Sequence, residues 1–156
     1  MEIYTDGACT GNPGAGGYGA VLMYGGARKE IFGGYTLTTN NRMELMAVIK
    51  ALEALKEKCK LNIYSDSRYV IDALAKGWAI KWRANNWMRT KKDRALNPDL
   101  WQKLLELLDG HKPNFIWVKG HASNAENNRC DELARNAIGY GELAEDIGYR
   151  KAMPTD

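Results

Sequence analysis

The chain begins with three strand-like runs and then alternates helices with strands, and this order constrains its fold. Residues 2–6, 18–24 and 30–37 are short apolar or β-branched runs separated by Gly-rich turns. The Gly25-Gly26 pair suits a tight hairpin, and Gly33-Gly34 suggests a bulge in the third run. We therefore expect an antiparallel meander at the start of the fold.

Beyond residue 38 the apolar spacing becomes helical. Leu45, Ile49 and Leu52 follow a Thr-Thr-Asn-Asn capping segment at i, i+4 and i+7, which predicts a helix to about residue 58. Further elements are expected as strands at 61–64 and 115–118 and helices at 67–74, 99–108 and 129–138. The order predicts an α/β fold with a mixed five-stranded sheet, three strands antiparallel and two parallel, flanked by helices.

The composition is that of one folded domain. At 156 residues and +3 net charge, the chain shows neither a membrane-length apolar run nor a signal-peptide pattern. Cys9, Cys59 and Cys130 lack CxxC spacing, so we expect no disulfide framework or zinc site, and a cytoplasmic location. We expect residues 1–140 to form the domain and the weakly patterned residues 141–156 to form a C-terminal tail.

Four carboxylates lie at the boundaries between predicted elements and loops. Asp6 and Asp66 follow apolar strands that should be parallel neighbours, so both should reach the same edge of the sheet. Glu44 opens the first helix, and Asp131 lies near the start of the last one. Acids brought together there repel one another unless a cation binds, and hard divalent cations prefer carboxylate oxygens. The pattern predicts a magnesium-type site.

A basic segment at about 76–96 interleaves cations with tryptophans. One interpretation is a solvated helix face with a few core tryptophans. The other is a surface for a nucleic-acid backbone, because cations neutralise phosphates and rings pack on sugars or bases. Its candidate contact residues are Trp78, Lys81, Trp82, Arg83, Lys91 and Lys92.

Six ordered motifs resemble the type 1 ribonuclease H family, from about residue 2 to residue 138. They are Thr5-Asp6-Gly7, Gly11-Asn12-Pro13-Gly14, Thr39-Asn40-Asn41-Arg42-Met43-Glu44-Leu45, Ser65-Asp66-Ser67, Trp117-Val118-Lys119-Gly120-His121 and Asn127-Asn128-Arg129-Cys130-Asp131-Glu132-Leu133-Ala134. The basic segment resembles the substrate-binding handle of the bacterial members. The resemblance implies a ribonuclease H-like fold and hydrolysis of the RNA strand of RNA–DNA hybrids, leaving 5′-phosphate and 3′-hydroxyl ends.

The resemblance also implies a metal site. It matches Asp6, Glu44, Asp66 and Asp131 to the family's metal-binding carboxylates, which hold two Mg²⁺ ions with substrate, with Mn²⁺ as a substitute. Asp6 would bridge the ions, Glu44 and Asp66 would flank one, and Asp131 the other. The expected partner is an RNA–DNA hybrid, with no membrane and no obligatory protein partner, so the chain should act as a monomer.

The remaining expectations concern proton transfer and substrate contacts. His121 matches a loop histidine that assists proton transfer or product release, although a lone histidine is often structural. The minor-groove candidates are Asn12, Asn40 and Asn41, and the candidates near a DNA-strand phosphate are Thr39, Arg42 and Asn97, with helix capping as the alternative for most of them.

Arg68 departs from the pattern, because many bacterial relatives carry Gln there. An arginine can contact a phosphate but cannot accept a hydrogen bond, so a minor-groove contact at this position is in doubt.

Two other functions remain open at this stage. One is a hybrid-binding module without catalysis, which would not need four acids beside a polyanion. The other is a strand transferase or structure-specific DNase on the same fold, which fold alone allows. The basic segment and the asparagines favour hybrid binding.

Overall fold

The computed structural model describes residues 1–120 and 124–152. Within them, no helix combines the length and the apolar character needed to cross a membrane. The elements are β1 (Glu2–Cys9), β2 (Gly14–Tyr24), β3 (Ala27–Thr38), α1 (Asn40–Glu53), β4 (Lys60–Ser65), α2 (Arg68–Ala75), α3 (Trp78–Ala84), α4 (Pro98–Leu108), β5 (Lys112–Trp117), α5 (Ala125–Tyr140), β6 (Leu143–Ala144) and α6 (Ile147–Ala152).

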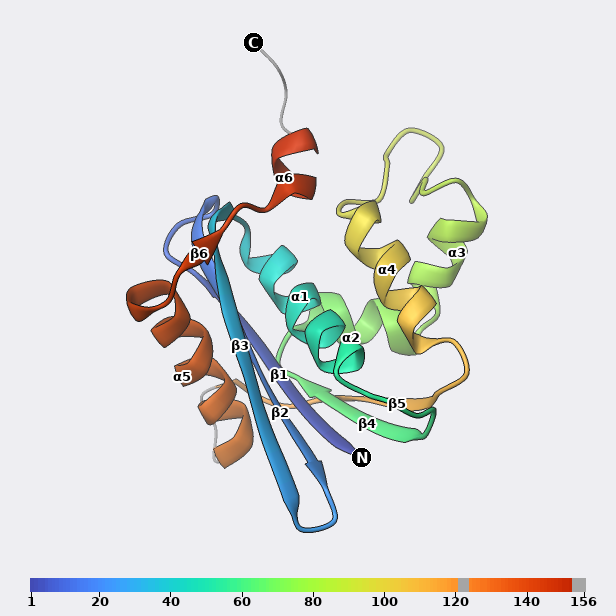
Figure 1. Cartoon of the computed structure of the whole chain (residues 1–156). Helices are drawn as coiled ribbons and strands as arrows, with labels where there is room; N and C mark the ends of the chain where they lie inside the picture. The colour runs from blue at the N-terminus through green and yellow to red at the C-terminus, as the bar shows by residue number, and fades with distance from the viewer. Residues whose placement is uncertain (121–123, 153–156) are drawn as a thin grey trace.

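The sheet is mixed, and its strand order is β5-β4-β1-β2-β3-β6. β1, β2 and β3 form the predicted antiparallel meander, and β4 and β5 run parallel to β1. Helices α1 to α4 lie on one side of the sheet and α5 on the other (Figure 1). The α/β class and the strand directions predicted from the sequence are confirmed.

The predicted number of strands was wrong, because the sheet has six strands within the described residues. β6 pairs in parallel with β3 through Gly34 with Leu143 and Tyr35 with Ala144. A two-residue strand is too short to carry an alternating pattern, so it left no signal in the sequence. The segment expected as a tail, 141–156, thus contributes both β6 and α6. The domain boundary at residue 140 stays a prediction.

Two finer predictions also fail. The first helix ends at Glu53 rather than near residue 58, because the chain needs the following loop to return to β4. The β2–β3 register shifts between Gly14 and Gly16, not at Gly33-Gly34. A Cβ on Gly33 would lie 2.3 Å from the Tyr18 hydroxyl, so that glycine makes room for a ring.

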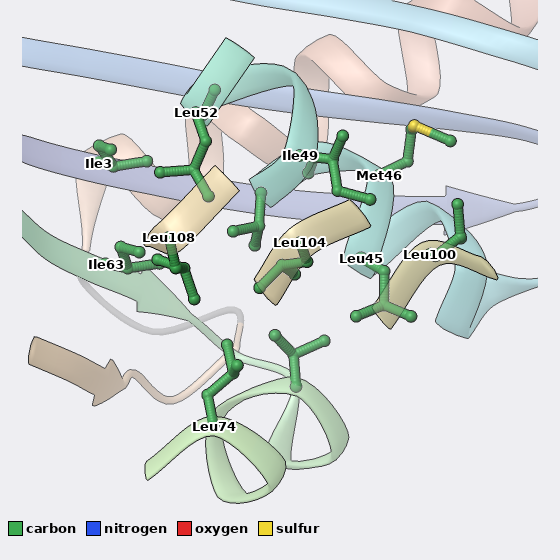
Figure 2. Packing of buried hydrophobic residues seen from close by; sticks show 14 of the residues in the cluster. Ile3, Leu45, Met46, Ile49, Leu52, Ile63, Leu74, Leu100, Leu104 and Leu108 are labelled. Carbon is green, nitrogen blue, oxygen red and sulfur yellow. The ribbon is translucent and has the colours of Figure 1, made fainter. Parts of the chain in front are cut away.

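The main core lies between the sheet and helices α1, α2 and α4. Figure 2 shows Leu45, Ile49 and Leu52 of α1 among side chains from the sheet and from α4. Trp101 of α4 is fully buried and has T-shaped contacts with Tyr69 and Trp82. This packing holds α1, and with it Glu44, firmly against β1.

Close backbone approach holds α5 on the opposite side of the sheet. A Cβ on Gly17 would lie 2.2 Å from the Ala134 carbonyl oxygen, and one on Gly19 would lie 2.4 Å from that of Cys130. Only glycine in β2 allows the helix to sit this low. As a result Asp131, next to Cys130, lines the same hollow as Asp6 of β1.

Candidate active site

Asp6 and Asp66 meet where two parallel strands separate. The β1–β4 pairing runs from Glu2 with Asn62 to Tyr4 with Tyr64, and no further pairs follow. Asp66 comes directly after β4, as predicted, whereas Asp6 lies inside β1, which stays paired with β2 as far as Cys9. Both acids therefore face the space that opens beyond the last β1–β4 pair.

Glu44 completes the cluster from the first turns of α1. A Cβ on Gly7 would lie 2.5 Å from the Glu44 backbone nitrogen, so Gly7 allows α1 to approach β1 closely. One ligand oxygen from each of Asp6, Glu44 and Asp66 lies within 4.8 Å of the others. Asp6 and Glu44 are each only 4% exposed. Three carboxylates from three separate segments thus converge, as the sequence predicted.

The electrostatics of the cluster favour a bound cation. Burial and the nearby Asp66 carboxylate raise the pKa of Asp6 to about 7. Burial, followed by Asp6, raises the pKa of Glu44 well above its ordinary value. Within the described residues, the buried Oε2 of Glu44 has no hydrogen-bond partner. An orphaned carboxylate oxygen beside two more carboxylates fits a hard divalent ion, which would supply the missing partner.

Asp131 borders the same hollow but lies apart from the three clustered acids. The hollow measures about 280 Å³, and Asn40 and Ser67 also line it. The Asp131 carboxylate forms an ion pair at 2.8 Å with Arg135, which lies one helical turn further along α5. The structure therefore places Asp131 at the rim of the cluster. His121, the fifth predicted catalytic residue, lies outside the described residues.

A second hollow gathers all three residues expected near a DNA-strand phosphate, Thr39, Arg42 and Asn97. It measures about 330 Å³, and its lining includes Asn12, Thr39, Asn41, Asn97 and Tyr149. Thr39 also caps α1, accepting a hydrogen bond from the Arg42 backbone nitrogen at 3.3 Å. Asn97 makes no side-chain cap for α4. Capping is therefore confirmed for Thr39 but not for Asn97.

Asparagines 12 and 40 meet between the two hollows. The Asn12 side chain accepts a hydrogen bond from the Asn40 backbone nitrogen at 3.1 Å, across a gap of 28 residues in sequence. Both residues are exposed. Their amides thus lie together at a surface that connects the carboxylate cluster with the second hollow.

Arg42 is buried rather than presented to a ligand. Its side chain is 2% exposed and forms ion pairs with Asp99 at 2.7 Å and Asp146 at 2.8 Å. The Asp146 side chain is itself 4% exposed and also accepts a 2.7 Å hydrogen bond from Thr38. Through these ion pairs Arg42 connects α1 with α4 and with the C-terminal segment, next to the second hollow.

The basic segment divides between surface and core. Lys81, Arg83, Lys91 and Lys92 are exposed, as is Trp78 at 41%. Trp82 and Trp87 instead pack against the main core, Trp82 at 5.9 Å from the Trp101 ring. The segment therefore has the solvated cations and the core tryptophans of the first interpretation, and its contact with a nucleic-acid backbone stays a prediction.

Three residues at the site were not among the candidates from the sequence. Arg135 lies four residues after Asp131, a helical spacing that would have predicted the pair. Trp117, whose ring nitrogen donates to the Asp66 carbonyl at 3.0 Å, stands in one of the quoted motifs. Asp146 lies 104 residues from Arg42, and nothing in the sequence connects the two.

Known proteins resemble this chain along nearly its whole length. A family model described as RNase H matches residues 1–139. The chain is 60% identical over 147 residues to "Ribonuclease H" of Syntrophus aciditrophicus, covering 94% of this chain and 85% of that protein. It is 53% identical over 152 residues to "Ribonuclease HI" of Synechocystis sp., covering 97% and 95%.

A solved structure resembles this one as well. LC9-RNase H1, described as a type 1 RNase H with the type 2 active-site motif, is 28% identical with a TM-score of 0.74, covering 99% of this chain and 81% of that one. With the family model, the relatives and the fold in agreement, the chain belongs to the ribonuclease H family of enzymes.

Proposed function

We propose that the protein hydrolyses the RNA strand of RNA–DNA hybrids by two-metal-ion catalysis at Asp6, Glu44, Asp66 and Asp131, with Mg²⁺ as its ion and Mn²⁺ as a substitute. The observation that carries this proposal is the convergence of three carboxylates within 4.8 Å around a buried, unpartnered oxygen of Glu44. In the ribonuclease H family, such a cluster serves phosphodiester hydrolysis that leaves 5′-phosphate and 3′-hydroxyl ends.

The four carboxylates would have different roles in binding the ions. Asp6, which clusters with Glu44 and Asp66 and lines the same hollow as Asp131, would hold both ions, with Glu44 and Asp66 as further ligands of one ion and Asp131 of the other. When bound, a pair of divalent ions stabilises the attacking and leaving oxygens of an in-line displacement. Asp131 is oriented by its ion pair with Arg135 at 2.8 Å, which suits a ligand at the rim of the site.

His121 would assist proton transfer or product release. A histidine titrates near neutral pH, so it can pass a proton between the reacting oxygens and solvent. Its place in the Trp117-to-His121 motif supports this role.

Substrate contacts would extend from the cluster in two directions. Asn12, Asn40 and Asn41 would lie along the minor groove, where their amides can recognise the 2′-hydroxyl of RNA. Thr39 and Asn97 would hold a phosphate of the DNA strand in the second hollow, above the buried Arg42. The exposed cations of the basic segment, Lys81, Arg83, Lys91 and Lys92, would add phosphate contacts, with Trp78 packed on a sugar or base and Trp82 supporting the segment.

We further infer that the protein acts as a cytoplasmic monomer. Each proposed ligand and contact residue comes from one chain, so a second copy is not needed to complete the site.

The test is cleavage of matched RNA–DNA, RNA–RNA and DNA–DNA duplexes, each with and without Mg²⁺. We expect cleavage of the hybrid alone, only with metal, and confined to its RNA strand. Asp66→Asn should remove this activity. Asp72→Asn is the same change on an acid of α2 that pairs with Lys76, and it should leave the activity unchanged.

Each other outcome identifies a different function. Tight hybrid binding without cleavage would mean a binding module. Cleavage of DNA–DNA duplexes at a comparable rate would mean a DNase.

A further inference from the structure

Arg68 and Trp117 form a stacked pair beside the carboxylate cluster. The Arg68 guanidinium carbon lies 3.8 Å from the centre of the Trp117 ring. Arg68 is the first residue of α2, and its neighbour Ser67 lines the same hollow as Asp6, Glu44 and Asp66. Trp117 is the last residue of β5 and pairs in register with Ser65. The pair therefore lies at the Asp66 side of the hollow.

A hydrogen bond to the backbone next to the cluster fixes the position of the Trp117 indole. Its Nε1 donates a hydrogen bond to the Asp66 carbonyl oxygen at 3.0 Å, and the Val118 backbone nitrogen donates to the Ser65 carbonyl oxygen at 3.0 Å. Gly120 follows closely, since a Cβ there would lie 2.8 Å from an Asp66 carboxylate oxygen. The end of β5 thus braces the Asp66 backbone and gives Arg68 a rigid platform.

The guanidinium charge of Arg68 is not neutralised within the described residues. The described part of the chain gives Arg68 no ion pair, and the residue is exposed. Stacking occupies one face of the guanidinium and leaves its N–H edge free to donate. A cation in the first turn of a helix also opposes the helix dipole, and the first turn of α2 holds no acid to offset it. Apart from stacking on Trp117, the described structure thus gives the Arg68 charge no local partner.

From these observations we propose that Arg68 binds a phosphate of the RNA strand next to the one that is cleaved, and that Trp117 is the positioning residue that holds its guanidinium there. This rests on the proposed function, because it is the carboxylate cluster that identifies the nearby strand as RNA. Asn40 lines the hollow of the carboxylate cluster, whereas its neighbours Thr39 and Asn41 line the second hollow, where the DNA strand would lie. A planar donor fork fits a phosphate and, unlike an amide, cannot accept from a base or a 2′-hydroxyl.

The first experiment measures KM and kcat for hybrid cleavage across a salt series. Arg68→Gln should raise KM by roughly tenfold, as expected for one lost charge-assisted contact, with kcat almost unchanged. Its log–log salt slope should fall by about 0.7 to 0.9, the value for one phosphate. Lys103→Gln removes a charge on α4, where Lys103 pairs with Glu53 at the end of α1, and should change neither quantity.

The second experiment asks whether Trp117 acts through Arg68. Trp117→Leu should raise KM by a similar factor in the wild type but have little further effect once Arg68 is Gln. Trp117→Phe keeps a ring for the guanidinium and should preserve the salt slope. Arg68→Lys keeps the charge without the planar stack and should fall between the wild type and Gln. Independent, multiplying effects of the Arg68→Gln and Trp117→Leu changes would overturn the positioning role.

The third experiment identifies the strand. Binding of metal-free protein is measured for hybrids in which one linkage at a time carries a neutral methylphosphonate, with 2′-O-methyl protection beside each modified RNA linkage. One RNA-strand position should weaken binding to the wild type but not to Arg68→Gln. If that position lies on the DNA strand, or if Arg68→Gln leaves KM and the salt slope unchanged, the inference is wrong. A wild-type protein that does not cleave hybrids would refute the proposed function instead, while this binding experiment would still report on Arg68.

Discussion

Asp146→Asn should strongly destabilise the fold, because it leaves a buried arginine short of a partner. Asp146 accepts hydrogen bonds from Arg42 Nε at 2.8 Å and Nη2 at 2.9 Å, and from Thr38 Oγ1 at 2.7 Å. Arg42 and Asp146 are 2% and 4% exposed. Neither charge can recover its hydration without opening the structure, so the pair depends on its geometry.

The magnitude follows from what remains after the change. Breaking a buried ion pair by removing one partner costs about 3–5 kcal/mol. Here Asp99, 44% exposed, still pairs with Arg42, and an asparagine oxygen still accepts one hydrogen bond. We therefore expect a loss of about 2–4 kcal/mol in the free energy of unfolding near neutral pH. The C-terminal helix α6 should also loosen, since the Tyr149 backbone nitrogen donates to Asp146.

The loss should depend on pH in a defined direction. Burial disfavours the ionised Asp146, but hydrogen bonds from Arg42 and Thr38 outweigh burial and lower its pKa. A carboxyl whose folded pKa is depressed contributes stability above its unfolded pKa of about 4 and loses it as the pH falls through the folded pKa. The difference between wild type and variant should be complete at pH 6 and shrink below about pH 4.

The assay is urea unfolding of both proteins at pH 6 and again at about pH 3. Glu145→Gln is the control, because Glu145 is a neighbour that is half exposed in its pair with Arg150. That change should cost less than about 0.5 kcal/mol. A loss under about 1 kcal/mol for Asp146→Asn at pH 6, or a difference that stays constant as the pH falls, would refute the reasoning.

Three further predictions concern the catalytic proposal. Asp6→Asn should abolish Mg²⁺-dependent cleavage yet stabilise the metal-free protein by about 1 kcal/mol or more at pH 8. The folded pKa of Asp6 is raised to about 7, so ionising this carboxyl costs stability as the pH rises from its unfolded pKa of about 4 to about 7, and at pH 8 the full cost is present. Thermal unfolding with EDTA checks this, and a less stable variant would contradict it. His121→Ala should slow single-turnover cleavage by roughly ten- to a thousand-fold without weakening metal binding, and an unchanged rate would exclude the proton-transfer role. Replacing Lys81, Arg83, Lys91 and Lys92 together by Gln should raise KM and leave kcat at saturating substrate unchanged. The slope of log KM against log salt concentration should fall by about one for each phosphate contact that is lost. An unchanged slope would mean that the basic segment is only a solvated surface.

The sequence by itself determined the order and directions of the main strands. Glycine-rich turns separate β1, β2 and β3, and the change from alternating to helical spacing at α1 predicts the parallel crossover to β4. Because apolar runs must be buried, the acids at their ends could be placed at one edge of the sheet before any coordinates were known. Asp6, Glu44 and Asp66 do converge there. These features depend on local patterns, which a sequence displays directly.

Only the tertiary structure decided how the charges are shared. The sequence placed Arg42 near a DNA-strand phosphate, yet its side chain is buried and pairs with Asp99 and Asp146. Trp82 and Trp87 of the basic segment pack against the core, and Arg68 stacks on Trp117, 49 positions further along the chain. Each of these contacts joins segments that are distant in sequence, and no periodicity records which distant partner a side chain meets. Burial and pairing are properties of packed surfaces, so they appear only once the helices lie on the sheet.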